Sequence, residues 1–453
     1  MTGLAADAEP FRPAVPAPRT RPAGIFEFLW LSWRDPLRIW SERHFDLPVL
    51  YGESRLGRAM TVSDPAGLRT VLVDEAANFH KDGVQRRVLG PLLGEGLFLA
   101  EDDDWRVMRR ILAPTFTPRR IAASAPKMAQ IARARVGTWG DVVDVDQQMT
   151  RLTFEILSAT LFSDALGGEA EDFEAALNAY IGRAARIDPL DVLGAPSWIP
   201  RVGRLMAGGA GAFFERRVKE LAVERRRTLQ AGGDLPDDLL NAQDPETGAG
   251  LTDRQVASNI LTFILAGHET TARALGWTLY LLARSPRHQA LVQREAADFD
   301  LAHPDRLEAL VWTRACFEEA MRLFPPAPLF TRVALKATKV AGRHVPAGTA
   351  MLISPWVLHR HRKLWEDPAA FRPERFLPEA REAIDRFAYL PFGGGPRICI
   401  GAAFAMQEAL IALAAVTKAV DLGPADAAEP LPAHRITLRP QSHIRLNVVR
   451  RDP

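Results

Sequence analysis

The chain has 453 residues, of which 47% are hydrophobic, 25% charged and 8% aromatic, which is the composition of an ordinary globular protein. Its 57 basic residues nearly balance its 55 acidic residues, so the charge favours neither nucleic acid nor an anionic membrane as a partner. The two cysteines, Cys316 and Cys399, are too few for a disulfide framework and indicate a reducing, cytoplasmic location.

The first part of the chain is predicted to be a proline-rich arm followed by short elements. Residues 1–23 hold prolines among alanines and arginines and are expected to be disordered. Helices are predicted over 25–33, 36–45 and 64–75, and strands over 49–51 and 59–62. We expect no signal peptide and no membrane span, because the apolar run 25–33 is short and contains Glu27.

The following part of the chain is predicted to be mostly helical. Residues 83–103 mix glycine and proline with apolar residues, and we expect an irregular loop that covers something. A helix then begins near Trp105, and Arg109 lies one turn later on the same face. Residues 126–232 have a helical composition, interrupted at 187–200 by an apolar connection between two helices.

A long helix is predicted over residues 252–282, with a capping box at its start and an unusual stretch at its centre. This stretch, Ala266-Gly267-His268-Glu269-Thr270-Thr271, has a low helix propensity. A Thr hydroxyl can also bond the carbonyl four residues back and bend the helix. The resulting notch leaves room for a small ligand, although a kinked structural helix would show the same pattern. Ala272 stands where a zinc-binding His-Glu-x-x-His pattern needs its second histidine, so that kind of site is excluded.

Charged residues and alternating stretches characterise the last third of the chain. Glu319 and Arg322 lie three residues apart on one predicted helix face, and Arg375 follows downstream. Arg332 begins an alternating stretch that is typical of an exposed strand. Strands are predicted over 333–340 and 348–354, and a terminal hairpin over 436–439 and 444–449.

Most of the chemistry is concentrated in the loop from Phe392 to Gly401, which contains Cys399. Gly393 and its glycine neighbours allow a tight turn, and the following helix places the sulfur at a helix N-terminus. The unpaired amides and the helix dipole there favour a thiolate, and Arg397 can pair with a carboxylate. An axial ligand of haem iron has these properties. The alternative is an ordinary turn with a small buried cysteine.

The spacing of this loop fits the pattern Phe-x-x-Gly-x-Arg-x-Cys-x-Gly, which resembles the haem-thiolate signature of the cytochrome P-450 family. The notch resembles the oxygen-activating stretch of that family, and Glu319, Arg322 and Arg375 match its structural triad. The resemblance covers roughly residues 25–450. It implies a mainly α fold with small β-sheets, built as one haem domain over 24–453.

The resemblance also assigns roles to individual residues. Those implied to contact the haem are Cys399 as the iron ligand, Phe392, Gly393 and Gly401 of its loop, Ala266 and Gly267 of the notch, and Arg397, Trp105, Arg109 and Arg332 at the propionates. Thr270 is implied to hydrogen-bond dioxygen, and Glu269 to belong to the path that delivers protons. Residues 187–200 correspond to a lid over the substrate.

The implied reaction is hydroxylation or epoxidation of a hydrophobic small molecule, such as a fatty acyl or terpenoid compound, with dioxygen, two electrons and haem b. Because the chain ends soon after Cys399, we expect the electrons to come from a separate ferredoxin or flavodoxin, supplied by NAD(P)H through a reductase. A basic cluster could receive an acidic donor, although a solvated helix face would look the same. This cluster consists of Arg109, Arg110, Arg119 and Arg120. The family default is a monomer, and a bacterial-type cytoplasmic enzyme is expected.

Two alternative functions remain open from the sequence. One is a haem-thiolate enzyme that uses peroxide directly, which the Glu269–Thr270 pair argues against because peroxide needs no proton delivery to dioxygen. The other is a non-catalytic haem protein that senses a gas or carries electrons. Apolar residues expected to line the substrate cavity are Leu97, Phe98, Ile260, Ile264, Leu329 and Phe330. They indicate an apolar substrate and do not identify it.

Overall fold

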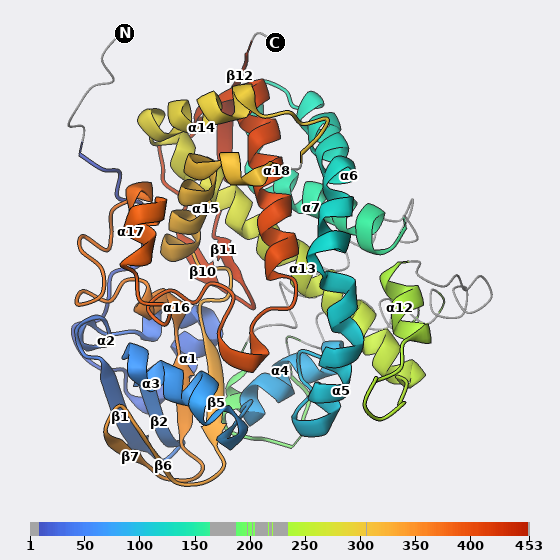
Figure 1. Cartoon of the computed structure of the whole chain (residues 1–453). Coiled ribbons are helices and arrows are strands. Elements are labelled where there is room, and N and C mark those ends of the chain that lie inside the picture. The colour runs from blue at the N-terminus through green and yellow to red at the C-terminus, as the bar shows by residue number, and fades with distance from the viewer. Residues whose placement is uncertain are drawn as a thin grey trace.

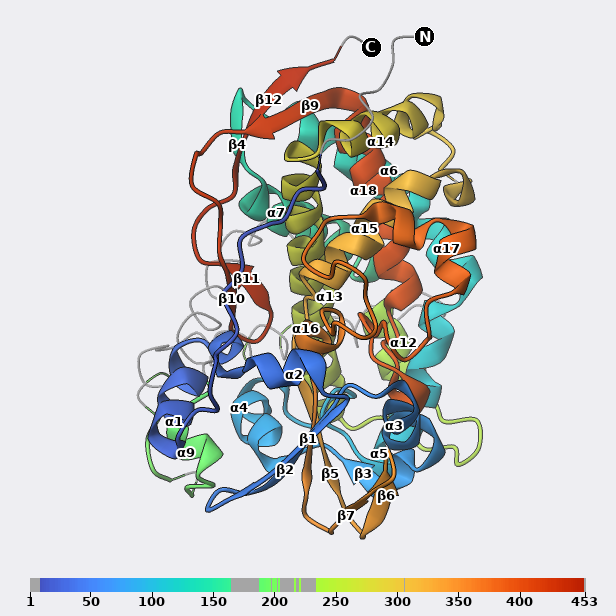
Figure 2. The same ribbon diagram turned by 90° about the vertical axis from the view of Figure 1, so that its left-hand side faces the viewer.

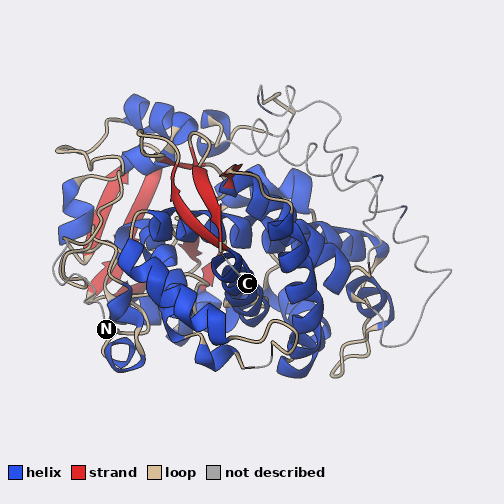
Figure 3. Cartoon of the chain, turned by 90° about the horizontal axis from the view of Figure 1, so that it is seen from above, coloured by secondary structure: helices blue, strands red, loops and turns tan. Residues whose placement is uncertain are grey.

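The protein is described by a computed structural model, in which a helical body stands over a smaller sheet region (Figure 1). The residues that the structure describes are 9–163, 187–196, 198–201, 203, 216, 220, 234–304 and 306–451. In the view from above, the strands gather toward one side and helices fill the other (Figure 3). This arrangement confirms the predicted mainly α fold with small β-sheets.

The helical body is organised around α13 (Asp253–Ala283), which packs along α7 and also contacts α14, α15 and α18. The other long helices are α4 (Gly83–Leu93), α5 (Asp102–Leu112), α6 (Pro118–Gly137), α7 (Val145–Leu161), α14 (Pro286–Asp298), α15 (Val311–Leu323) and α18 (Ala402–Ala419). The shorter helices are α1 (Ile25–Arg34), α2 (Glu42–Asp46), α3 (Pro65–Arg69), α9 (Pro189–Val192), α12 (Leu235–Asn241), α16 (Pro355–Leu358) and α17 (Pro378–Glu382). Single helical turns occur at Pro36–Ile39, Thr70–Asp74, Ala76–Asn78, Ala113–Phe116, Leu307–Ala309, Pro373–Phe376 and Gly395–Arg397.

The described strands form small sheets at the bottom and the top of the molecule as seen in Figure 2, with one two-stranded pair between them. One sheet has the order β1-β2-β8-β5-β3, with β2 and β8 parallel and the other pairs antiparallel. Its strands are β1 (Val49–Ser54), β2 (Gly57–Val62), β3 (Phe79–His80), β5 (Phe330–Ala334) and β8 (Ala350–Ile353). The other sheets pair β6 (Thr338–Val340) with β7 (Arg343–Val345), β10 (Pro432–His434) with β11 (Leu438–Pro440), and β12 (Arg445–Arg450) with β4 (Val142–Asp144) and β9 (Val420–Pro424).

The capping box predicted at the start of the long helix is confirmed. The Thr252 hydroxyl accepts from the Gln255 amide at 3.2 Å, and the Gln255 side chain accepts from the Thr252 amide at 3.0 Å. These two bonds satisfy donors that would otherwise be unpaired at the helix start. The sequence therefore identifies both the position and the beginning of α13.

Two predicted elements were wrong, and the strand expected over 333–340 is divided between β5, which ends at Ala334, and β6, which begins at Thr338 in another sheet. The loop expected over 83–103 begins with helix α4, because Asp82 caps its first turn by accepting from the Gln85 amide at 2.7 Å. The terminal hairpin expected over 436–439 and 444–449 does not form, because β11 pairs with β10 whereas β12 pairs with β9 and β4. Helix α4 was predicted as a loop because the glycines and prolines of 83–103 were given more weight than the capping residue Asp82. The hairpin was predicted because its two strands are neighbours in sequence, but neighbouring strands need not pair.

The described part of the N-terminal arm, residues 9–23, lies against the rest of the chain. The Phe11 carbonyl accepts from the Phe371 amide at 2.8 Å, and the Phe11 ring meets the edge of Tyr280 at 5.9 Å. The Arg19 amide donates to the Trp40 carbonyl at 3.0 Å. These contacts hold the extended segment in place against Tyr280 of α13, the loop before the helical turn Pro373–Phe376, and Trp40.

The structural triad predicted from the sequence is assembled and buried. The Arg322 guanidinium forms two hydrogen bonds with the Glu319 carboxylate, at 2.7 and 2.8 Å, and both side chains are fully buried. Arg375 approaches the same carboxylate at 3.5 Å. The remaining Arg322 donors reach the carbonyl oxygens of His359, Pro368 and Ala370. One side chain thereby ties α15 to the segment that leads toward the Cys399 loop.

Helix α18 is long and apolar enough to resemble a membrane-spanning segment, with a mean hydropathy of 1.3 over 18 residues. Of these residues, 67% are buried inside the protein. Because α18 packs against α6, α13, α14 and α15, its apolar character is that of a core helix.

We expect Glu319→Ala to lower the free energy of unfolding by about 3–5 kcal/mol, because it leaves the buried Arg322 charge without its carboxylate. Urea denaturation measures the change. The control is Glu53→Ala, which removes a surface partner of Arg58 and should cost no more than about 1 kcal/mol. Equal losses in the two variants would contradict a special role for the buried pair.

Candidate active site

Two glycines with left-handed backbone shape the loop that carries Cys399. Gly393 and Gly395 have φ angles of 73° and 68°, in a region that residues with a Cβ atom disfavour. A Cβ on Gly395 would lie 1.8 Å from the carbonyl oxygen of Leu72, so only glycine fits there. The Cys399 amide donates to the Phe392 carbonyl at 2.9 Å and closes the loop. The compact turn predicted from the glycines is therefore present.

Cys399 lies two residues before Gly401, which is the N-cap residue of α18. Its side chain is exposed to open space, although protein atoms crowd its other sides. Burial raises the pKa of the Cys399 thiol, whereas the Gly401 amide and the Arg109 guanidinium lower it. Because burial is the largest of these effects, the helix N-terminus alone does not favour the thiolate as expected. A metal cation at the sulfur would reverse this balance.

The arginines and the tryptophan predicted near the loop converge on it. Arg109 donates to the Ile398 carbonyl at 3.1 Å, and the Arg397 guanidinium lies 4.6 Å from the centre of the Trp105 ring. Arg397 also donates to the Ala100 carbonyl at 2.9 Å and pairs with the Glu101 carboxylate. The structure thus brings Trp105, Arg109 and Arg397 together with the Cys399 loop.

A surplus of buried positive charge surrounds Arg397. Lys81 lies 3.7 Å from the Glu101 carboxylate, and Arg332, only 9% exposed, donates to the carbonyl of Thr331 at 2.8 Å. Burial and the nearby Arg397 lower the pKa of Lys81 to about 7 and that of Arg332 to about 10. In the described part of the chain, Glu101 is the one carboxylate bonded to this group of three cations.

This surplus fits the two propionate groups of a haem, because buried cations become stable when an anion neutralises them. Cys399, with its accessible sulfur, fits the axial ligand. The residues that would hold a haem are therefore Cys399 at the iron and Lys81, Arg332 and Arg397 at the propionates. Lys81 was not predicted from the sequence, since a single lysine in a polar turn gives no local signal.

The notch in α13 is a break in an otherwise buried helix. Ala266 is exposed and Thr270 is half-buried, whereas the residues on both sides of the notch are almost all buried. The Thr270 hydroxyl donates to the Ala266 carbonyl at 2.6 Å, which is the predicted bond to the residue four positions back. Gly267 lets α7 approach closely, because a Cβ there would lie 2.7 Å from the Leu157 side chain.

Glu269 points away from this exposed face and is buried in an ionic network. Its carboxylate accepts from Arg439 at 2.6 Å and from the Thr437 hydroxyl, and Arg273 lies 4.0 Å away. Burial acts to raise the pKa of Glu269, but Arg439 and Arg273 together lower it below its ordinary value. Glu269 is thus held as a carboxylate. Arg273 could have been found from its spacing of four residues, but nothing local links Arg439 to position 269.

His268, which the sequence left without a role, is a buried aromatic packing residue. Its ring lies edge-on to that of Phe154 with 5.7 Å between the ring centres, and neither ring nitrogen has a hydrogen-bond partner among the residues that the structure describes. Burial and the positive charges of Arg273 and Arg439 lower the pKa of His268 to about 4, against the opposing effect of Glu269. The ring is therefore neutral in the folded protein.

Two groups of residues do not occur as predicted. Ile260 and Ile264 were expected to line a substrate cavity, but both are fully buried on the core side of α13, whereas Phe98 is 40% exposed. In the predicted basic cluster, Arg110 pairs with Asp244 at 2.6 Å and Arg120 pairs with Asp238. Arg119 is exposed and remains a candidate to meet an acidic partner.

The segment expected as a lid is a compact turn in its described residues, 187–196 and 198–201. Arg201 is buried and bonds to the Asp191 carboxylate at 3.0 Å. It also donates to three backbone carbonyls of the same segment, those of Ala195, Pro196 and Ile199. The backbone carbonyl of Asp191 in turn accepts a hydrogen bond from the Arg87 side chain of α4 at 2.8 Å.

We expect stability to fall as the pH drops from 6.5 to about 4, because the unfolded chain takes up a proton on His268 that the folded chain excludes. The neutral ring leaves the free energy of unfolding undiminished above pH 6.5. By pH 4 the free energy of unfolding has fallen by about 3 kcal/mol. His268→Phe should remove this part of the acid sensitivity, measured by urea denaturation at several pH values. His344→Phe, at an exposed position on β7, should leave it unchanged. An unchanged pH profile in His268→Phe would contradict the neutral buried ring.

Comparison with known proteins relates this geometry to a family. The family model described as Cytochrome P450 matches residues 48–448, and the heme domain of cytochrome P450DA superposes with a TM-score of 0.81 at 26% identity, covering 98% of this chain and 99% of that chain. Cyclooctatin synthase of Streptomyces melanosporofaciens is 34% identical over 86% of this chain and 84% of its own length. Cyclooctat-9-en-7-ol 5-monooxygenase of the same organism is 32% identical over 94% of this chain and 93% of its own length.

Proposed function

Because this chain belongs to the cytochrome P-450 family of haem-thiolate monooxygenases, we propose that it hydroxylates or epoxidises a lipophilic terpenoid compound. The relative named for acting on cyclooctat-9-en-7-ol, an unsaturated alcohol, supports the terpenoid over the fatty acyl class. Exposed Phe98 supports an apolar substrate. The reaction takes dioxygen, two electrons and two protons, and water is its second product.

The observation that carries this proposal is the Cys399 thiol at the start of α18, with the cations of Arg109 and Arg397 beside its loop. When bound, haem supplies the activation of dioxygen. The chain supplies the ligand and the charges around it. The Gly401 amide and Arg109 stabilise negative charge on the sulfur, and Lys81, Arg332 and Arg397 would neutralise the propionates of a bound haem.

Thr270 and Glu269 have different parts in proton delivery. The Thr270 hydroxyl lies on the exposed face of the notch and can turn from the Ala266 carbonyl to hold a proton toward the open side. Glu269 is held on the opposite side by Arg439 and Thr437. We assign Thr270 the direct role and Glu269 the role of a carboxylate that can accept a proton and pass it on when Arg439 moves away.

Electrons come from a separate ferredoxin or flavodoxin that is reduced by NAD(P)H through its reductase. The bacterial relatives, which the chain matches over most of their length, support this arrangement. Arg119 is the exposed cation of the predicted docking cluster, since Arg110 and Arg120 are engaged in ion pairs within the chain. A monomer in the bacterial cytoplasm is the setting we propose.

We expect the reduced, carbon monoxide-bound protein to show the strongly red-shifted absorption band of thiolate-ligated haem, and Cys399→Ala to lose that band. The control is Cys316→Ala, because Cys316 is fully buried in α15 and burial raises its thiol pKa well above the ordinary value. A histidine-type band in the unmodified protein, or loss of the band in both variants, would overturn the assignment of Cys399.

Thr270→Ala should lower the amount of oxidised product formed per NAD(P)H consumed by roughly tenfold or more, with haem content unchanged, because it removes the proton held at the notch. Product and NAD(P)H are measured in the same reaction. Thr278→Ala is the matched control, since Thr278 makes the same backbone bond, to Ala274 at 2.7 Å, but is fully buried. Equal uncoupling in both variants would indicate a structural effect of the helix, not proton delivery.

A further inference from the structure

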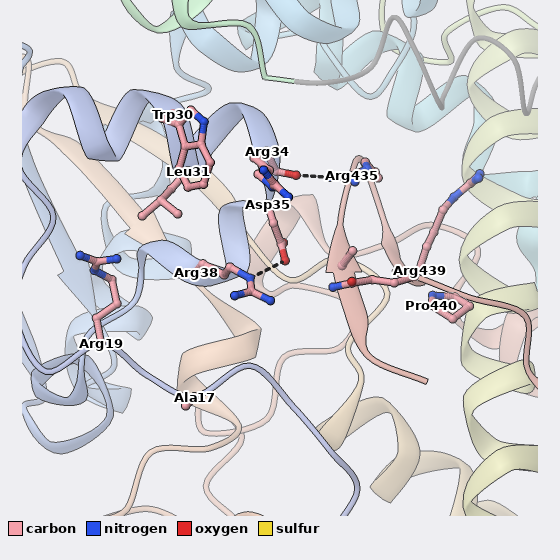
Figure 4. Close-up of a pocket in the computed structure, with 12 residues that line it drawn as sticks. Ala17, Arg19, Trp30, Leu31, Arg34, Asp35, Arg38, Arg435, Arg439 and Pro440 are labelled. Carbon is pink, nitrogen blue, oxygen red and sulfur yellow. Dashed lines mark hydrogen bonds and ion pairs between the residues drawn. The ribbon is translucent and has the colours of Figure 1, made fainter. Parts of the chain in front are cut away.

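The charges near the Cys399 loop are balanced differently from those of an ordinary ion pair. An ordinary pair lies beside the cavity of about 850 Å³ between α1 and the β10–β11 pair, where the Arg38 guanidinium is 3.6 Å from the Asp35 carboxylate (Figure 4). The cationic group near the Cys399 loop has three members, and in the part of the chain that the structure describes Glu101 is the carboxylate bonded to it. The position of Glu101 therefore decides how much positive charge is left for a ligand.

The Glu101 carboxylate is divided between two of the three cations. Its side chain is 7% exposed, and the residue is the N-cap of α5. One oxygen, Oε1, accepts from the Lys81 backbone amide at 2.7 Å and lies 3.7 Å from the Lys81 ammonium. The other oxygen, Oε2, pairs with the Arg397 guanidinium. Both oxygens are thus committed to groups that would also hold the propionates.

The residue before Glu101 contributes to the same arrangement. The Ala100 carbonyl accepts from the Lys81 ammonium and from the Arg397 guanidinium, both at 2.9 Å. Two consecutive residues at the start of α5 therefore hold the same two cations, Ala100 through its backbone and Glu101 through its charge. This fixes both cations in place before any ligand arrives, so their field at the haem site is fixed too.

Three cations exceed the charge of two propionates by one, and Glu101 offsets that excess. The other charges nearby are less effective. Asp82 is committed to capping the first turn of α4. The side chains of Arg86, Arg106 and Asp102 are more than half exposed, so water screens their charges.

An enclosed charge beside a haem changes how readily the iron accepts an electron. Reduction of the iron adds one negative charge to the haem, so a nearby positive charge favours the ferrous form and a nearby negative charge favours the ferric form. The effect is large only where water does not screen the charge. Glu101, with its side chain almost covered, satisfies this condition.

We propose that Glu101 sets the reduction potential of the bound haem by offsetting one of the cations that hold the propionates. Glu101 is a positioning residue, because it acts through Lys81 and Arg397. The proposal rests on the haem site at Cys399 described above. It adds to that site a negative charge that keeps the potential low.

The test is a redox titration of the haem-loaded full chain, in which the ferric and ferrous absorption bands are followed as the potential is changed. Glu101→Gln should raise the midpoint potential, because the amide keeps the size of the side chain and an oxygen for the Lys81 amide but loses the charge. Measurements below pH 7 keep Lys81 protonated, because its pKa is about 7 in the chain alone and propionates would raise it.

A second variant gives a shift of the opposite sign. Lys81→Gln should lower the midpoint potential, because it removes a cation from the same group. The double variant with Lys81→Gln and Glu101→Gln should return the potential toward that of the unmodified protein, since one charge of each sign is lost. Comparison of the double variant with Lys81→Gln alone measures the effect of Glu101 a second time.

Two controls separate charge from structure. Glu101→Asp keeps the charge and should leave the potential close to that of the unmodified protein. Asp102→Asn removes the same charge from the next residue, whose side chain is 65% exposed. It should shift the potential less, and added salt should abolish its shift while the shift of Glu101→Gln persists.

The carbon monoxide-bound spectrum of each variant shows which proposal has failed. An unchanged potential in Glu101→Gln, with the thiolate-type band intact, would overturn the role of Glu101 and leave Cys399 as the iron ligand. Equal shifts in Glu101→Gln and Glu101→Asp, or shifts of the same sign in Glu101→Gln and Lys81→Gln, would also overturn it, because they would indicate a change of structure. Absence of the band in the unmodified protein would overturn the proposed function itself, and this inference with it.

Discussion

The buried ion pair between Glu319 and Arg322 is the interaction on which the rest of the haem side depends. Every polar hydrogen bond of Arg322 is made either to Glu319 or to carbonyl oxygens of the segment from His359 to Ala370. That segment, which contains no long helix, is therefore anchored to α15 by Arg322, and its own Arg360 donates to the carbonyl of Leu323 at the end of α15. The loop around Cys399 follows it in sequence and inherits its position from this anchor.

The charges of the candidate site form two separate groups. Lys81, Arg332 and Arg397 form a cationic group near the Cys399 loop, and burial makes each of them costly without an anion. In the other group, Glu269 of α13 is enclosed by Arg273 and Arg439 and is kept ionised. The first group therefore still needs an anion, whereas the second already holds one.

Local patterns predicted the parts of the site that are encoded within a few residues. The capping box at Thr252, the back-bonded Thr270 and the loop of Cys399 are all settled by neighbours in sequence, and all three occur as predicted. Helix α4 was missed because its cap at Asp82 is a weaker signal than the glycines and proline that follow. The division into an arm over 1–23 and a haem domain over 24–453 stays a prediction.

Contacts between distant segments could not be predicted. The Glu269–Arg439 bond joins residues 170 positions apart, and each of them alone has the pattern of an ordinary surface charge. The burial of Ile260 and Ile264 depends on which face of α13 meets α7, and the periodicity of a helix that is apolar nearly all round does not decide this. The same limit applies to β12, whose partners come from β4 and β9.

The turn around Arg201 has a consequence for how this segment can change in evolution. Its backbone carbonyls at Ala195, Pro196 and Ile199 all point at one guanidinium, which Asp191 holds in place. Because the bonds use backbone oxygens, the side chains in between contribute little to the shape. Related chains can therefore carry other side chains in this segment, which changes its surface. The shape of the segment is kept as long as both Asp191 and Arg201 are present.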